Sequence, residues 1–311
     1  MKNKKIFFTS VGIIILTLII SIFAFVPIDK THDSYSKTWL KNVDDNAKIT
    51  EVSLPGTHDS GATHSIADVA GKCQDISIKT QLEIGVRFFD LRLQLVNNEF
   101  KIVHSFVDQN LKFSAVLEDL YNFIKENSSE YLIISIKEEA GSTNSTLWFD
   151  EALIRDFEKY NDVFMINENK LPETVKEARG KIYLLSRFSG NIGIPAHYGW
   201  ADDCAFEFDN IYVQDNYNIQ DIEEKKKDIL AAINYANTNK DKLVLNFTSC
   251  YLDPGFPPLY AGTAALALNP WFLETISNTK DNLGIIVADF ITENLSKVIY
   301  MRNVKWELYL K

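Results

Sequence analysis

Short runs of aliphatic residues alternate with longer amphipathic stretches along most of this chain, and this alternation constrains the fold more than any other feature. The runs are rich in Ile, Val and Leu, as expected for strands of a parallel sheet that is covered on both faces. The strand candidates are residues 50–54, 86–95, 101–104, 131–137, 181–187, 210–215, 242–248 and 283–290. Helical patterns lie between several of them, at residues 113–126, 149–160, 220–236 and 293–303. About eight strands joined by helices predict an α/β fold whose parallel sheet closes into a barrel.

Length and charge narrow the class of protein further. The chain has 311 residues and is 46% hydrophobic, which is enough for one full barrel and its core. The formal net charge of -10 argues against nucleic acid as a partner and against a broad basic surface for membranes. Cys73, Cys204 and Cys250 are far apart and odd in number, so they imply neither a disulfide framework nor a zinc motif.

The N-terminal segment has a different composition from the rest of the chain. Lys2, Lys4 and Lys5 precede an uncharged apolar run that is long enough to span a bilayer, at roughly 20 residues. Basic residues before such a run are typical of export, and the sequence leaves open whether the segment is a cleaved signal peptide or a retained anchor. Either way, we expect the rest of the protein to work outside the cytoplasm. The expected organisation is a signal or anchor at residues 1–29, a linker at residues 30–45, and a single folded domain at residues 46–311.

Polar and charged residues stand at or near the carboxyl-terminal end of nearly every strand candidate. In a barrel these ends meet at one face, which is where active sites lie. Any one such residue is equally compatible with a capped turn or a surface ion pair, but the complete set indicates a site. The residues are His58, Asp90, Arg92, His104, Lys137, Arg187, Asp215, Asn246 and Asp289.

The stretch SLPGTHDSG, at residues 53–61, brings His58, Asp59 and Ser60 together. By themselves these neighbours fit an activated nucleophile, part of a metal site, or a polar turn. The other groups favour acid–base chemistry, because His104 supplies a second imidazole and no Ser or Cys nucleophile with a base is evident. Arg92 has the planar fork of donors that suits a phosphate. Two imidazoles around a phosphate held by arginine form the layout for cleaving a phosphodiester with an internal hydroxyl.

An ordered set of motifs makes the sequence recognisable over about residues 45 to 300. The set is SLPGTHDSG, RFFDLRLQL, KIVHS, YLIISIKEE, ARGKIYLLSRFSG, YVQDNY, LNFTS and GIIVADFITEN. In this order the motifs resemble the bacterial phosphatidylinositol-specific phospholipases C of the metal-independent, secreted type. The resemblance implies a distorted TIM-type barrel, irregular and partly open. It also implies cleavage of phosphatidylinositol in a membrane surface, to diacylglycerol and inositol 1,2-cyclic phosphate, by a monomer that needs no cofactor.

The resemblance also assigns roles to individual residues. His58 matches the general base that removes the proton from the inositol 2-hydroxyl, and Asp289 orients it. His104 matches the general acid that protonates the diacylglycerol oxygen, assisted by Asp59. Arg92 matches the group that holds the phosphate, with Asp90 as its organiser on the same face of the strand. The residues that match the inositol-binding groups are Lys137, Arg187, Asp215 and Tyr217, with Trp200 beside them.

Arg92 also bears on the need for a metal. In the calcium-dependent relatives the equivalent position is acidic, and a bound cation does the work of the guanidinium. Because a cation cannot comfortably share a site with Arg92, the sequence predicts catalysis without a metal. A tryptophan is usual in the rim loop of the family where this chain has LDPGFPPLYAG. Phe256 and Tyr260 are therefore the candidates for membrane insertion, and a packed proline-rich loop is the alternative.

Two other functions remain as alternatives. A metal-dependent glycerophosphodiesterase is also a barrel with two histidines. It would carry His-Arg-Gly and a Glu-x-Asp metal pair, where this chain has His58-Asp59-Ser60 and Asp90-Leu91-Arg92. An inositol-binding module tethered to a membrane would have lost a catalytic His or Arg, and both types are present. The sequence does not decide between free phosphatidylinositol and glycosyl-phosphatidylinositol anchors as substrate.

Overall fold

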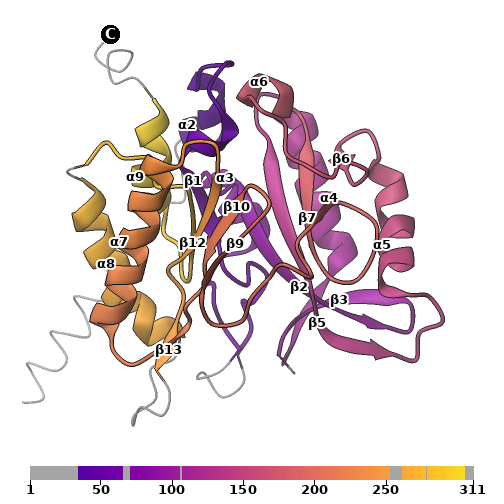
Figure 1. Ribbon diagram of the computed structural model, residues 1–311. Helices are drawn as coiled ribbons and strands as arrows, with labels where there is room; N and C mark the ends of the chain where they lie inside the picture. Colours follow the sequence, from indigo (N-terminus) through magenta and orange to yellow (C-terminus); the bar gives the residue numbers. More distant parts are fainter. Residues whose placement is uncertain (1–33, 66–70, 106, 253–260, 278, 305–311) are drawn as a thin grey trace, which may run out of the picture. The chain divides into compact units, whose positions relative to one another are not determined.

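The computed structural model describes residues 34–65, 71–105, 107–252, 261–277 and 279–304 (Figure 1). Its main feature is one curled sheet in which the strands follow the order β6-β7-β5-β2-β1-β14-β12-β10-β9. Neighbours from β6 to β10 are parallel, and β9 is antiparallel to β10. Among the described residues no ladder joins β9 to β6, so the sheet forms an open half barrel. The strands are β1 (Leu54–Thr57), β2 (Phe88–Val96), β5 (Leu132–Thr143), β6 (Phe164–Met165), β7 (Ile182–Arg187), β9 (Ala205–Phe208), β10 (Ile211–Gln214), β12 (Leu243–Phe247) and β14 (Ile285–Ala288).

Helices cover the outer face of this sheet. Figure 1 shows α7, α8 and α9 close to β12, and α4 and α5 beside β5 and β7. The helix α4 buries Phe113, Val116, Leu117 and Leu120, a spacing of three and four residues that gives one apolar stripe. The helices with six or more residues are α3 (Ile78–Glu83), α4 (Phe113–Glu126), α5 (Phe149–Phe157), α7 (Ile222–Thr238), α8 (Ala261–Ser277) and α9 (Glu293–Tyr300).

Smaller elements complete the fold. The strands β3 (Glu99–His104) and β4 (Val107–Lys112) extend β2 as an antiparallel meander. The remaining strands are β8 (Ile194–Pro195), β11 (Asn218–Ile219) and β13 (Tyr251–Leu252). The short helices are α2 (Ser34–Lys37), η1 (Trp39–Asn42), η2 (Ile49–Glu51), η3 (Glu158–Tyr160), α6 (Val175–Ala178) and η4 (Met301–Asn303).

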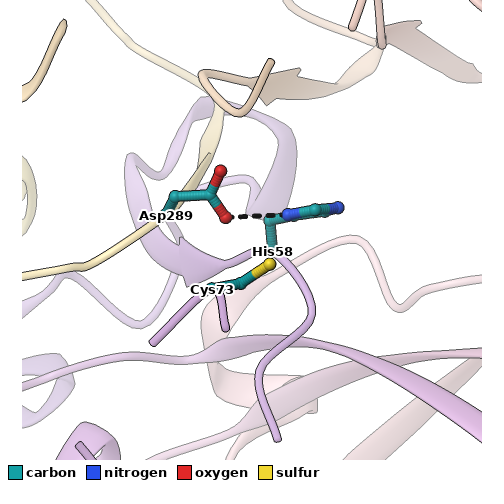
Figure 2. A group of neighbouring side chains, drawn as sticks. All are labelled: His58, Cys73 and Asp289. Carbon is teal, nitrogen blue, oxygen red and sulfur yellow. Dashed lines mark hydrogen bonds and ion pairs between the residues drawn. The ribbon is translucent and has the colours of Figure 1, made fainter. Parts of the chain in front are cut away.

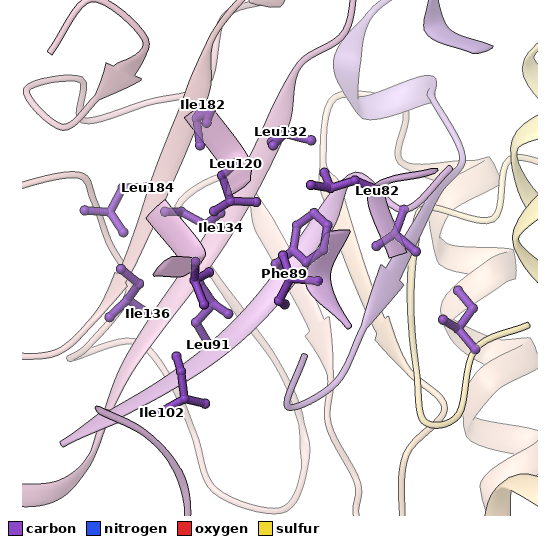
Figure 3. Close-up of a cluster of buried hydrophobic side chains, with 14 of the residues drawn as sticks. Leu82, Phe89, Leu91, Ile102, Leu120, Leu132, Ile134, Ile136, Ile182 and Leu184 are labelled. Carbon is purple, nitrogen blue, oxygen red and sulfur yellow. The ribbon is translucent and has the colours of Figure 1, made fainter. Parts of the chain in front are cut away.

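Alternation along the strands separates two cores. Phe89 and Leu91 of β2 lie with Ile134 and Ile136 of β5 and with Leu120 of α4, in the cluster between sheet and helices (Figure 3). The intervening residues face the inside of the half barrel, because successive side chains of a strand point to opposite faces. The inner cluster contains the apolar residues Phe88, Ile133, Tyr183, Leu245, Ile285 and Val287. Toward the carboxyl-terminal ends of the strands, the same inner faces change from apolar to charged. The charged residues there are Asp90, Arg92, Lys137, Arg187 and Asp289.

Two expected elements differ from the structure. Residues 50–54 are not a strand over their whole length: η2 occupies Ile49–Glu51, and β1 begins only at Leu54, where its pairing with Ile285 of β14 begins. The expected linker at residues 30–45 is corrected in its described part, because α2 and η1 occur there. Trp39 and Leu40 are fully buried, and the Trp39 ring stacks on Tyr300 at 5.1 Å. The described part of this segment is therefore packed on the domain.

The apolar run that precedes these helices lies outside the described residues, as do Phe256 and Tyr260 of the expected membrane rim. Within the described part of the chain, no helix combines the length and apolar character needed to cross a bilayer.

Candidate active site

Three cations form a row across three neighbouring parallel strands. Arg92 of β2 is in register with Lys137 of β5, and Lys137 is in register with Arg187 of β7. All three line one cavity of about 1320 Å³ at the carboxyl-terminal ends of the strands. Because the strands are parallel and in register, the sheet itself sets the spacing of these positive charges. Such a row is suited to an anionic group such as a phosphate.

His58 lies directly after β1 and is held from both sides. Its Nδ1 is 2.8 Å from Oδ1 of Asp289 (Figure 2). Its Nε2 is 2.8 Å from Nη2 of Arg92. A guanidinium only donates, so Nε2 accepts and carries no proton, and the proton of the neutral ring is on Nδ1. Burial disfavours a charged ring, but the charge and hydrogen bond of Asp289, together with the charge of Asp59, raise the pKa of His58. This arrangement presents a basic nitrogen to the cavity.

The loop that carries His58 is tied to the end of β14. The His58 amide donates to the carbonyl of Ala288, and the buried Gln74 side chain donates to the carbonyls of both His58 and Ala288 at 2.9 Å. The Gln74 oxygen accepts from the amide of Ile291. Asp289 is thereby kept in reach of a histidine that is 231 residues away in sequence.

His104 ends β3 and lies near Asp59. Its Nε2 is 3.6 Å from Oδ2 of Asp59, and the same oxygen is 3.4 Å from Nε of Arg92. Asp59 is fully buried, and neither of its carboxylate oxygens has a hydrogen-bond partner among the described residues. Burial raises the pKa of Asp59, and the positive charge of Arg92 offsets this only in part. Its backbone has φ of 43°, a left-handed conformation that Asp tolerates better than most residues.

Asp90 connects the two arginines of the row. Its Oδ2 is 3.4 Å from Arg92, and its Oδ1 is 3.2 Å from Arg187. Burial opposes ionisation of Asp90, but the two guanidinium groups lower its pKa to about 2. The carboxylate therefore stays charged and fixes the direction of both arginines.

The residues expected around the inositol ring all line this cavity. The Arg187 guanidinium lies 3.6 Å from the ring centre of Trp200, and Trp200 Nε1 donates to Oδ2 of Asp215 at 3.3 Å. The Tyr217 hydroxyl donates to Asp202 at 2.7 Å. The aromatic and polar side chains of this group are thus held in place by defined contacts. A pocket for a sugar-sized ring needs such fixed groups to orient its ligand.

Two residues of the site were missed by the sequence analysis. Glu139 lies 2.7 Å from Nζ of Lys137 and 3.5 Å from Nη1 of Arg92, and these cations lower its pKa to about 2 although burial opposes the charge. Its position two residues after Lys137 on β5 is the signal that would have found it. Cys73 is the other residue: it is fully buried and its Sγ is 3.9 Å from Nδ1 of His104. Burial raises the pKa of this thiol well above its usual range, and nothing in its sequence context indicates its location.

The geometry places two imidazoles, each near a carboxylate, beside a row of three cations. One histidine has an unprotonated nitrogen that accepts from Arg92, and the other has a carboxylate within 3.6 Å. With an anion site between them, one such group can take a proton from the attacking hydroxyl of a phosphate ester, and the other can give a proton to the leaving oxygen. The protein is therefore an open α/β barrel, and the carboxyl-terminal ends of its strands form a site suited to a phosphate ester.

Comparison with known proteins identifies the family. Residues 53–188 match the model for the phosphatidylinositol-specific phospholipase C X domain. The chain is 31% identical over 288 residues to 1-phosphatidylinositol phosphodiesterase of Staphylococcus aureus strain Newman, covering 83% of this chain and 90% of that protein. The corresponding Listeria monocytogenes protein is 28% identical over 291 residues, covering 86% and 85%. The chain belongs to the bacterial phosphatidylinositol-specific phospholipase C family.

Solved structures agree with this assignment. A double mutant of the Staphylococcus aureus phospholipase superposes with a TM-score of 0.76 at 26% identity, covering 89% of this chain and 99% of that one. The Listeria monocytogenes enzyme gives a TM-score of 0.72 at 27% identity, covering 87% and 99%. The expected fold, a partly open barrel of the TIM type, is confirmed.

Proposed function

We propose that the protein cleaves phosphatidylinositol to diacylglycerol and inositol 1,2-cyclic phosphate. The observation that carries the proposal is the position of His58 between Asp289 and Arg92, which sets a basic nitrogen directly beside the row of cations. The 1-phosphatidylinositol phosphodiesterases to which the chain is similar support phosphatidylinositol as the substrate.

In the first step His58 acts as the general base. Its Nε2 takes the proton of the inositol 2-hydroxyl, in the place that the Arg92 donor occupies in the free protein. The Asp289 carboxylate accepts from Nδ1 and stabilises the imidazolium that forms. Arg92 then turns its donors to the phosphate, where they stabilise the charge that develops as the hydroxyl attacks phosphorus.

In the same reaction His104 acts as the general acid. It gives its proton to the diacylglycerol oxygen as the bond from phosphorus to that oxygen breaks, and Asp59 stabilises the charged form of His104 before transfer. Because the nucleophile is a hydroxyl of the substrate itself, the phosphate leaves as a cyclic diester. Lys137, Arg187, Trp200, Asp215 and Tyr217 hold the inositol ring.

The reaction proceeds without a metal ion in this proposal. Arg92 supplies the positive charge at the phosphate, and its interactions with Asp59, Asp90 and Glu139 hold it in place. These acidic contacts raise the pKa of Arg92 well above its usual range despite burial, so its charge is permanent. A hard cation such as Ca²⁺ would be repelled from the same position.

The proposal extends to the rest of the chain. Residues 1–29 serve as an export signal or as an anchor. The catalytic domain, which includes the described residues from Ser34 on, works as a monomer outside the cytoplasm, either secreted or on the outer face of the membrane. Phe256 and Tyr260 insert into the membrane surface that holds the substrate. Glycosyl-phosphatidylinositol anchors are a second substrate class for the same cavity.

Cleavage of phosphatidylinositol vesicles by two histidine variants tests the mechanism. His58→Ala and His104→Ala should each lower kcat by about 10²- to 10⁴-fold with EDTA present, the range for loss of a general acid or base. Circular dichroism of each variant establishes that it is folded. A folded variant with a near-normal rate would remove that histidine from its role.

A further inference from the structure

Cys73 contributes a sulfur to two groups of potential metal ligands. Ligand atoms of His58, Cys73 and Asp289 lie within 4.8 Å of one another, and so do those of Asp59, Cys73 and His104. Figure 2 shows the thiol next to the His58–Asp289 pair. Each group offers one nitrogen, one sulfur and one carboxylate oxygen, the donor types that Zn²⁺ prefers. The proposed reaction does not use the thiol.

The two groups differ in how many of their donors are already engaged. Both ring nitrogens of His58 have partners at 2.8 Å, in Asp289 and Arg92, so a metal would have to break strong contacts there. Among the described residues, the His104 ring makes only a 3.9 Å contact from Nδ1 to the sulfur and a 3.6 Å approach of Nε2 to Asp59. Asp59 adds two buried oxygens without a hydrogen-bond partner among the described residues. The His104 group is therefore the one that is open to a ligand.

The ligand atoms of the open group lie slightly farther apart than the ligands of tetrahedral zinc. Bonds of about 2.0–2.3 Å from zinc to N, O and S place neighbouring ligand atoms about 3.3–3.7 Å apart. The 3.6 Å separation joins Nε2 of His104 to Asp59, whereas the 3.9 Å contact joins its Nδ1 to the sulfur. A metal takes one of these nitrogens, and one ligand atom from each of the three residues lies within 4.8 Å of the others, so a shift of about 1 Å closes the group around zinc. Both Cys73 and His104 line the cavity, so the fourth position faces open space.

Charge also permits a soft cation at this position but not a hard one. Arg92 is 3.4 Å from Oδ2 of Asp59 and repels any cation placed there. A thiophilic ion displaces the proton of Cys73 and gains a thiolate, which together with the Asp59 carboxylate balances its two charges. Calcium and magnesium bind thiolates weakly and gain no such compensation. Acidic side chains also outnumber Lys and Arg among the described residues of the cavity wall.

We propose that Zn²⁺ binds Asp59, Cys73 and His104 and thereby inhibits the enzyme. Zinc occupies the nitrogen of the general acid and the carboxylate that supports it, so the leaving oxygen receives no proton. Binding of zinc rests on the geometry alone, whereas inhibition rests on the proposed function. Calcium and magnesium at the same concentration leave activity unchanged.

Metal binding is tested directly with Co²⁺ in place of zinc, using the full chain. Wild type should show the absorption of a tetrahedral site with a charge-transfer band from sulfur to cobalt, and zinc should abolish it. Absence of the sulfur band in wild type would overturn the proposal without reference to any variant. Isothermal titration with Zn²⁺ should show at least about 100-fold weaker binding for Cys73→Ser, since loss of a ligand costs no less than loss of an outer-shell partner.

Matched variants locate the site. Cys250 is also buried and lines the same cavity but belongs to neither group, so Cys250→Ser should bind zinc like wild type. His104→Ala should weaken binding and His58→Ala should not. The reverse result for the two histidines, or equal binding by Cys73→Ser and wild type, would contradict the assignment.

Activity measurements distinguish failure of the proposed zinc site from failure of the proposed catalytic function. Zinc should inhibit cleavage of phosphatidylinositol vesicles, EDTA should restore it, and Cys73→Ser should need at least about 100-fold more zinc for the same fractional loss. Zinc bound at Cys73 without loss of cleavage would overturn the inhibitory role. A protein that binds cobalt through Cys73 but never cleaves phosphatidylinositol would keep the metal site and refute the proposed function.

Discussion

At the residue scale, the partners of His58 determine when it can act as a base. The carboxylate of Asp289 raises the pKa of His58, and burial and Arg92 act in the opposite direction. A base works only when unprotonated, so activity should fall as the pH drops below this raised pKa. The position of the acid limb in a pH profile is therefore a direct report on the His58–Asp289 contact.

Asp289→Asn should move that acid limb to lower pH. The substitution removes the negative charge that favours the imidazolium and leaves the burial that disfavours it, so the pKa of His58 falls. The measurement is kcat/KM against pH with phosphatidylinositol vesicles. Asp215→Asn is the control, because Asp215 is not among the main causes of the shifted pKa of His58, and the acid limb of this variant should stay in place. If the acid limb of the pH profile did not move in Asp289→Asn, His58 would not be the titrating base.

Arg92→Lys tests whether geometry or charge matters at the phosphate. Lysine keeps the charge but lacks the planar fork that contacts His58, Asp90 and Glu139 together. We expect kcat to fall by about 10²- to 10³-fold, as for loss of one preorganised donor to the transition state. Steady-state kinetics on vesicles measures the effect, and a change of only a few-fold would indicate that a point charge is sufficient.

The sequence indicates some of these residue contacts and hides others. The spacing of two between Asp90 and Arg92 predicts a shared strand face, and the structure has both on the inner face of β2. Glu139 follows the same rule on β5 but was overlooked among the charged residues after that strand. The place of Cys73 near His104 was not predictable, since it depends on how a long loop returns to the site.

At the element scale, the segment before the barrel is part of the folded domain. Trp39 is fully buried, stacks on Tyr300 and donates from Nε1 to the carbonyl of Gly85 at 2.9 Å. The composition of this segment, polar residues around one Trp, predicts a linker. Burial of one large aromatic side chain nevertheless contributes several kcal/mol to the free energy of unfolding. The described part of this segment is therefore held by tertiary contacts that local composition does not reveal.

Trp39→Ala should lower the free energy of unfolding by about 3–5 kcal/mol, the range for removing a large aromatic side chain from a core. Urea unfolding followed by circular dichroism measures it. Trp148→Ala is the matched control, because Trp148 is 76% exposed and its loss should change stability by no more than about 0.5 kcal/mol. Equal effects of the two substitutions would mean that Trp39 does not anchor the segment.

At the scale of the whole molecule, the parallel sheet brings distant motifs to one cavity. The aliphatic runs predict most of its strands, because buried strands must be apolar on both faces. The number of strands does not predict that the sheet remains open, which depends on the antiparallel β9 at one end and the short β6 at the other. The polar strand ends predict most of the site, because a parallel sheet places these ends together. Asn246 is the exception: its side chain donates to the carbonyl of Ile229 in α7, and it is not among the described residues that line the cavity.

The central claim is that this cavity makes a cyclic phosphate without a metal. Phosphorus NMR of phosphatidylinositol vesicles, incubated with the protein and excess EDTA, tests it most directly. We predict that the signal of inositol 1,2-cyclic phosphate grows as that of the lipid declines. A non-cyclic inositol phosphate as the first product, or cleavage that appears only after calcium is added, would contradict the account.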